Sequence, residues 1–121
     1  MSQILALRPF VPAQDFAVSK RFYAAMGFTQ TYGDDDIAMF KQESFSFILQ
    51  NFYVAAAAEN FMVQMLVRDA EAWWRDVEIP ALGESFSIPA PRAPALQPWG
   101  MKVGFITDPS GVLWHIAEVI F

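Results

Sequence analysis

The chain has 121 residues, of which 55% are hydrophobic, and eight basic against thirteen acidic residues give it a formal net charge of -5. This length suits a single domain with its own core, and the absence of cysteine excludes a disulfide scaffold, a thiolate metal site and a cysteine nucleophile. The negative charge without a basic cluster argues against nucleic acid as a partner. No apolar run approaches the roughly 20 residues of a membrane helix, and the chain begins with no signal-like segment. We therefore expect a soluble, cytoplasmic protein.

The first half of the chain predicts an opening strand followed by a helix. The apolar run at 4–11 is typical of a strand. Asp15 can accept from the free N–H groups of a first helical turn, and Gly27 suits the left-handed position after a last turn. We therefore expect a helix that continues to about Met26. Its buried side carries four bulky residues: Phe16, Phe22, Tyr23 and Met26.

Three strands are expected after this helix, at 28–32, 37–40 and 45–50. The last of them has the alternation of side chains that is typical of a strand. Three consecutive aspartates at 34–36 lack the alternating ligands and the distal glutamate of a calcium loop. They predict a solvated hairpin turn.

The second half of the chain begins in the same order. Residues 61–67 predict a strand, and Asp69 is the next helix N-cap. The helix that follows has apolar residues at i, i+3, i+4 and i+7, which form one face: Ala70, Trp73, Trp74 and Val77. We expect both tryptophans of this face to lie in the core.

A proline-rich stretch at 80–98 follows this helix, and we expect a loop there with one short strand near 85–88. Strands are predicted at 101–106 and 112–119. They are joined by the turn at 108–111, whose proline and glycine stand where such turns favour them.

A β-α-β-β-β unit is therefore repeated within one chain, which predicts the α+β class. Module one covers about 1–57 and module two about 58–121. The join falls in the connector at 53–60, which contains four consecutive alanines and no strand pattern. We expect one domain made of two modules.

Three phrases stand in this order: RPFVPAQDFAVSKRFYAAMGF at 8–28, VRDAEAWWRDV at 67–77 and QPWGMKVGFITDPSGVLWHIAE at 97–118. Together they resemble the vicinal-oxygen-chelate superfamily, which includes glyoxalases, ring-cleaving dioxygenases and bleomycin-resistance proteins, and they are closest to the bleomycin-resistance branch. The resemblance covers essentially the whole chain. It implies two βαβββ modules that form a cupped mixed sheet with the helices on the outside. It also implies a homodimer whose subunits pair their modules around a small-molecule site.

The resemblance further implies a divalent metal, held by an opening-strand and a closing-strand position in each half. The opening positions hold Arg8 and Met62, and the closing positions hold Gln50 and His115. An arginine only donates and a thioether is too soft for these metals, with Gln64 the nearby polar substitute for Met62. One histidine in the chain cannot complete a set of two histidines and a carboxylate. We expect no metal and no other cofactor; a metal site shared across a dimer is the disfavoured alternative.

Seven residues are candidates to contact a ligand. The two glutamines can hydrogen-bond it, and aromatic residues near the first of them can form a wall. Trp99 follows a long loop, where it either packs against the sheet or stands at the pocket rim. His115 is either a structural residue of its strand or a group that binds a ligand or moves a proton. The candidates are Arg8, Gln50, Phe52, Tyr53, Gln64, Trp99 and His115.

Two hypotheses follow for the function. The first is a metal-free homodimeric binding protein that sequesters a partly aromatic or cationic ligand in a cup between two chains. The alternative is a lyase or dioxygenase, either with an atypical shared metal or with His115 as a general base and Arg8 as an anion-stabilising group. Gly-x-Ser-x-Gly elbows and glycine-rich phosphate loops are absent from the sequence, so serine-hydrolase and nucleotide-binding chemistry are not supported.

Overall fold

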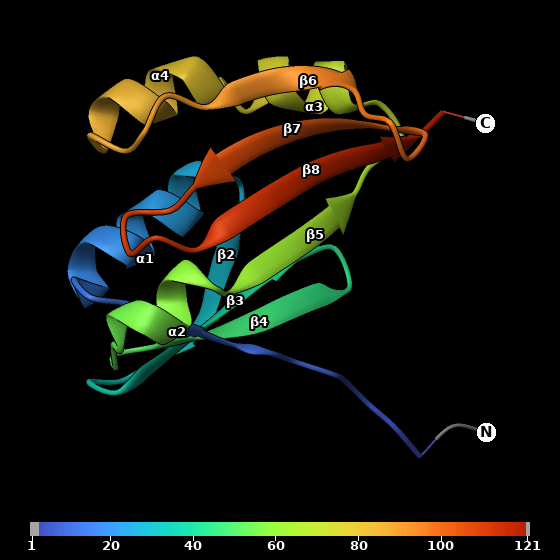
Figure 1. Ribbon diagram of the computed structural model, residues 1–121. Coiled ribbons are helices and arrows are strands. Elements are labelled where there is room, and N and C mark those ends of the chain that lie inside the picture. Colours follow the sequence, from blue (N-terminus) through green and yellow to red (C-terminus); the bar gives the residue numbers. More distant parts are fainter. Residues whose placement is uncertain (1–2, 121) are drawn as a thin grey trace.

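The fold consists of two sheets with helices packed beside them (Figure 1). The structure is a computed structural model and describes residues 3–120. The first module contains β1 (Phe10–Pro12), α1 (Phe16–Ala25), β2 (Thr29–Gly33), β3 (Ile37–Gln42) and β4 (Phe45–Gln50). The connector contains α2 (Ala55–Glu59). The second module contains β5 (Met62–Leu66), α3 (Ala70–Asp76), α4 (Ile79–Ser85), β6 (Arg92–Leu96), β7 (Met101–Thr107) and β8 (Leu113–Val119).

Both modules have the same sheet topology. The strand order is β1-β4-β3-β2 in the first sheet and β5-β8-β7-β6 in the second. In each sheet the first strand runs parallel to the last, and the other pairs are antiparallel. The predicted α+β class and the repeated βαβββ unit are therefore confirmed, with α4 as an additional helix in the second module. No helix within residues 3–120 is long and apolar enough to cross a membrane.

The helix α1 begins and ends where the sequence predicts. The Asp15 carboxylate accepts from the backbone N–H of Val18 at 3.2 Å, and Gly27 adopts a positive φ of 102° just after the helix. The N–H of Phe28 donates to the carbonyl of Tyr23, which closes the last turn. Phe22, Tyr23 and Met26 are buried as predicted, and Phe16 packs half-buried beside them.

The helix α3 is capped by two acidic side chains. Asp69 accepts from the N–H of Ala72 at 3.0 Å, and Glu118 on β8 accepts from the N–H of Ala70 at 2.8 Å. Trp74 is buried against the second sheet as predicted, whereas Trp73 is only half-buried and lines a cavity between the modules.

The turn at 34–36 is also as predicted, because the Asp34 carboxylate accepts from the backbone N–H groups of the turn.

The predicted opening strand at 4–11 is wrong for most of its length. Only Phe10–Pro12 pairs with β4 as a strand, and Arg8 and Pro9 still hydrogen-bond to β4. The residues before them extend away from the sheets as an arm, seen at the blue end of the chain in Figure 1. Leu5 and Leu7 in this arm are 96% and 92% exposed. An apolar run predicts a strand only where a neighbouring strand supplies hydrogen bonds, and β4 has its first β1 partner at Phe10.

The predicted loop at 80–98 with a strand near 85–88 is also wrong. Residues 79–85 form α4, and the strand of this stretch is β6 at Arg92–Leu96. Pro80 lies in the first turn of α4, where its missing N–H removes no helical hydrogen bond. Pro94 is tolerated in β6 because that strand is at the edge of its sheet.

An aromatic cluster connects the two modules. The Tyr23 ring contacts the rings of Phe47 and Trp114, with centroids 4.8 and 5.5 Å away, and Phe47 in turn lies 5.7 Å from Trp114. Because Tyr23 and Phe47 belong to module one and Trp114 to module two, the core crosses from one module to the other. Much of the aromatic excess of the sequence is used here.

A buried polar network runs through the same region. The Tyr23 hydroxyl donates to Asp108 at 2.5 Å and accepts from the indole N–H of Trp114 at 3.0 Å. Asp108 also accepts from the backbone N–H groups of Ser110 and Val112. Burial raises the pKa of Asp108, against the effect of these hydrogen bonds. Burial, and then the Asp108 charge, raises the pKa of Tyr23 well above its ordinary value.

Replacing Gly104 with alanine is expected to destabilise the protein by about 1–3 kcal/mol. A Cβ at this position of β7 would lie 2.5 Å from the Trp74 ring and 3.1 Å from Pro94. Urea unfolding of Gly104→Ala checks this, and the loss is expected to shrink in a Trp74→Phe background, where the ring is smaller. An equal loss in both backgrounds would contradict the steric explanation.

Candidate functional site

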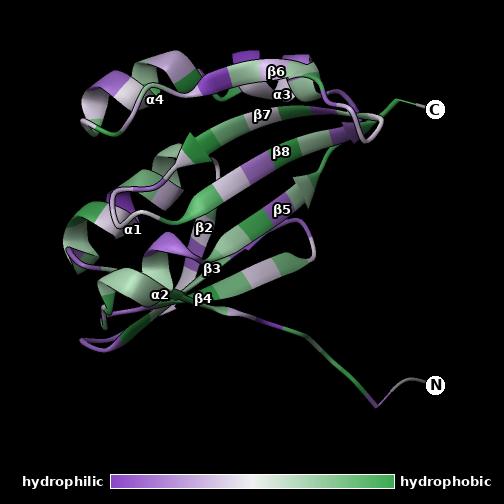
Figure 2. Ribbon diagram, viewed as in Figure 1, coloured by the Kyte–Doolittle hydropathy of each residue, from purple (hydrophilic) through white to green (hydrophobic). Residues whose placement is uncertain are grey.

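Each sheet has one face in the core and one facing outward. Along β8, Trp114 and Ile116 are buried in the core, so the intervening His115 points to the opposite side. Figure 2 shows this alternation as bands of colour along β4 and β8. We call the side opposite the core the outward face of each sheet.

A row of four side chains crosses the outward face of the second sheet. Gln64 on β5 pairs with His115 on β8, His115 pairs with Phe105 on β7, and Phe105 pairs with Arg92 on β6. The imidazole and the Phe105 ring meet edge to face with centroids 4.7 Å apart. The guanidinium carbon of Arg92 lies 4.5 Å from the centroid of the same ring. We call these four residues the His115 row.

Apolar side chains surround the His115 row without burying it. Met62 and Leu66 flank Gln64 on β5 and are 63% and 58% exposed, and Val119 on β8 is 53% exposed. Such a face combines an aromatic ring with a few polar groups in an apolar setting, which is the usual composition of a small-molecule site.

The outward face of the first sheet carries two other predicted residues. The Arg8 guanidinium donates to the Ser46 hydroxyl at 3.0 Å, and Gln50 lies on the same side of β4, four residues farther along. Tyr32 on β2 donates to Asp34 at 2.7 Å, and this hydrogen bond raises the pKa of the Tyr32 hydroxyl. Arg8 and His115 therefore lie on different sheets of the chain.

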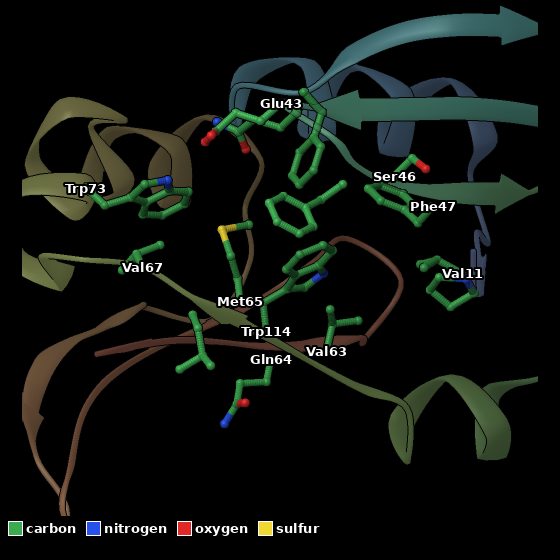
Figure 3. A pocket seen from close by; sticks show the side chains of 15 residues that line it. Val11, Glu43, Ser46, Phe47, Val63, Gln64, Met65, Val67, Trp73 and Trp114 are labelled. Carbon is green, nitrogen blue, oxygen red and sulfur yellow. The ribbon is translucent and has the colours of Figure 1, made fainter. Parts of the chain in front are cut away.

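A cavity of about 530 Å³ lies between the two modules (Figure 3). Gln64 borders it, but in Figure 3 its side chain points the opposite way from those of Val63 and Met65. The walls are mostly apolar and aromatic. They include Phe28, Phe47, Met65, Trp73 and Trp114.

The remaining predicted residues are dispersed. Tyr53 borders a smaller cavity of about 270 Å³ beside the turn at 108–111. Phe52 and Trp99 are 60% and 55% exposed and border neither cavity. The structure thus places Gln64 beside His115, whereas Arg8 and Gln50 share a face of the first sheet without lying beside each other. Phe105 and Arg92 complete the His115 row but were missed. β6 was not predicted, whereas the predicted hairpin around the turn at 108–111 is the signal that could have placed Phe105 opposite His115.

The residues at the expected metal positions do not fit a divalent metal. The strand neighbours of His115 are Gln64 and Phe105, and neither supplies a carboxylate or an imidazole. Arg8 brings a positive charge to its position. Within residues 3–120 no group of three histidine, aspartate or glutamate side chains is arranged to hold an ion.

The fold resembles that of several solved proteins. A bleomycin-binding protein complexed with bleomycin superposes with a TM-score of 0.77 and 21% identity, covering 93% of this chain and 97% of that chain. The bleomycin-binding protein of Streptomyces verticillus, complexed with copper(II)-bleomycin, gives 0.75 and 20%, covering 98% of both chains. Lactoylglutathione lyase from Agrobacterium tumefaciens gives 0.67 and 16%, covering 93% of this chain and 92% of that chain. No family model and no curated protein matches the sequence. The chain therefore has the glyoxalase and bleomycin-resistance fold.

Proposed function

We propose that this protein is a metal-free, homodimeric binding protein that sequesters a partly aromatic small molecule at the outward face of its second sheet. The His115 row carries the proposal. Phe105 and His115 offer ring surfaces, Gln64 offers both a donor and an acceptor, and the surrounding side chains are apolar.

Exposed apolar surface supports the homodimer. Phe10 and Met62 on the two outward faces are 53% and 63% exposed, and Leu5 and Leu7 of the arm are more exposed still. Exposed apolar side chains that gather on one face are typical of an interaction site. A second copy that covers an outward face would turn an open sheet into an enclosed cup.

The structural neighbours support the binding function by analogy of fold. Two of them are solved with bleomycin bound, so this scaffold can hold a large organic molecule. The lyase among the neighbours shows that the same scaffold also carries catalysis, so fold alone does not select the function.

The alternative function with His115 as general base has less support. A catalytic histidine is commonly oriented by a carboxylate that accepts from its ring N–H, and neither strand neighbour of His115, Gln64 or Phe105, supplies one. Arg8, the anion-stabilising group of that hypothesis, lies on the other sheet. Binding therefore accounts better for the arrangement.

Native mass spectrometry of the purified protein tests the proposal. We expect a dimer without metal, carrying a co-purified organic molecule that is lost on denaturation. In the variant His115→Ala the fraction of adduct-bearing dimer is expected to fall about tenfold, because the polar partner and part of the stacking surface are removed. Gln30→Ala, on the exposed strand β2, is the control and should retain the adduct. One metal ion per chain would contradict the proposal.

A further inference from the structure

The charge on the outward faces is opposite to that of the whole protein. The chain has thirteen acidic residues and a net charge of -5. Yet the strand positions that face outward hold Lys41 on the first sheet and Arg92 on the second, and Arg8 bonds to Ser46 on the first. None of the outward positions within the described strands holds aspartate or glutamate. The carboxylates of the protein lie on the helices, in the turns and on the core side of the sheets.

Arg92 is the basic residue closest to the His115 row and is not neutralised by the protein. The ion pairs within residues 3–120 are Arg75 with Asp76 and Lys102 with Glu71, and neither involves Arg92. The contact that positions the guanidinium is the Phe105 ring. A guanidinium stacked on a ring keeps the N–H donors at its edge free for a planar acceptor, and a carboxylate can accept two of them at once.

We infer that the ligand is an aromatic carboxylate whose acid group binds Arg92 while its ring system lies along Phe105 and His115. This inference rests on the proposed binding function and gives it a ligand class. Gln64 ends the row three strand spacings from Arg92, about 14 Å away. The preferred ligand therefore has two fused or linked rings, with a hydrogen-bonding group at the end remote from the acid.

The net charge of the chain alone favours a cationic ligand, and the outward faces reverse this preference. At the ionic strength of a cell, charges more than about 8 Å apart are largely screened, so the nearby Arg92 outweighs distant surface carboxylates. In a homodimer that pairs the outward faces, Arg8 and Lys41 would add to the positive potential of the cup.

Isothermal titration calorimetry with three matched probes tests the inference. The probes are 6-hydroxy-2-naphthoate, its neutral amide 6-hydroxy-2-naphthamide, and the cation 2-naphthylmethylammonium. We expect the naphthoate to bind about 10- to 100-fold more tightly than the amide, as for a hydrogen bond to a charged group, and the cation to bind most weakly. Raising the salt concentration should weaken naphthoate binding and leave amide binding unchanged.

Two variants with the same loss of charge localise the effect. Arg92→Met should reduce the naphthoate affinity to that of the amide, whereas Arg75→Met, which removes an exposed guanidinium from α3, should leave it unchanged. Circular dichroism confirms that both variants are folded.

The remaining outcomes separate the two proposals. Equal binding of naphthoate and amide, or tightest binding of the cation, would overturn the carboxylate assignment and leave the binding function standing. A naphthoate affinity that is unchanged in Arg92→Met would also overturn it. No saturable heat with any probe up to about 5 mM, which is weaker than a typical specific site, would count against the binding function itself.

Discussion

Replacing Asp108 with alanine is expected to lower the free energy of unfolding by about 1–3 kcal/mol for each buried donor left without a partner. The substitution removes the acceptor of the Tyr23 hydroxyl and of two backbone N–H groups, all in the buried turn before β8. Buried donors that lose their partner cost more than the net value of the bonds themselves. Urea unfolding at neutral pH measures the loss.

Asp76→Ala is the matched control for this prediction. Asp76 is 73% exposed and pairs only with the equally exposed Arg75, so its removal should change the stability by less than about 0.5 kcal/mol. Similar losses for the two variants would show that the Asp108 network is not specially stabilising.

The stability of the wild type relative to Asp108→Asn is expected to fall as the pH rises. Burial raises the pKa of Asp108 in the folded state above its unfolded value of about 3.9. The folded protein therefore holds this proton more tightly, so the contribution of Asp108 to stability is greatest below about pH 3.9 and declines until the folded pKa is passed. Unfolding curves of both proteins between about pH 3.5 and 7 check the sign, and a difference that grows with pH would refute it.

Replacing both Leu5 and Leu7 with serine is expected to weaken the proposed homodimer by about 100-fold or more. Both side chains are almost fully exposed in one chain, and burying a leucine typically contributes about 1.5–3 kcal/mol. Sedimentation equilibrium of the double variant measures the change in dimer dissociation constant.

Val54→Ser is the control for the arm, because Val54 is a 49% exposed apolar residue just before α2. It should leave the dimer intact. A wild type that sediments as a monomer at all concentrations, or a double variant that dimerises as tightly as the wild type, would remove the arm from the interface.

The repeated topology could be predicted from local signals. Asp15 and Asp69 mark the starts of α1 and α3, and Gly27 marks the end of α1, because caps satisfy backbone groups within a few residues. Strand alternation likewise depends only on neighbouring positions. These features need no knowledge of the rest of the chain.

The candidate site depended on pairings that local signals do not determine. The sequence predicts His115 and Gln64 as ligand-binding residues. Arg92 and Phe105 belong to the same row because of the register of β6, β7 and β8. The prolines around β6 predict a loop, but an edge strand also tolerates proline. The arm shows the converse case, because its apolar residues have the composition of a strand but the strand pairing with β4 begins only at Phe10.

The hydrogen bonds between Tyr23, Asp108 and Trp114 link the two halves of the chain. Although each half has a complete sheet, Tyr23 lies in one half and the other two residues lie in the other. A fragment ending near 57 would expose the Tyr23 ring and leave its hydroxyl without its present partners. The complementary fragment would leave Asp108 and Trp114 without Tyr23, so neither half alone retains an intact interior. The two halves should therefore melt together in a single transition, and separately expressed halves should gain structure only when mixed.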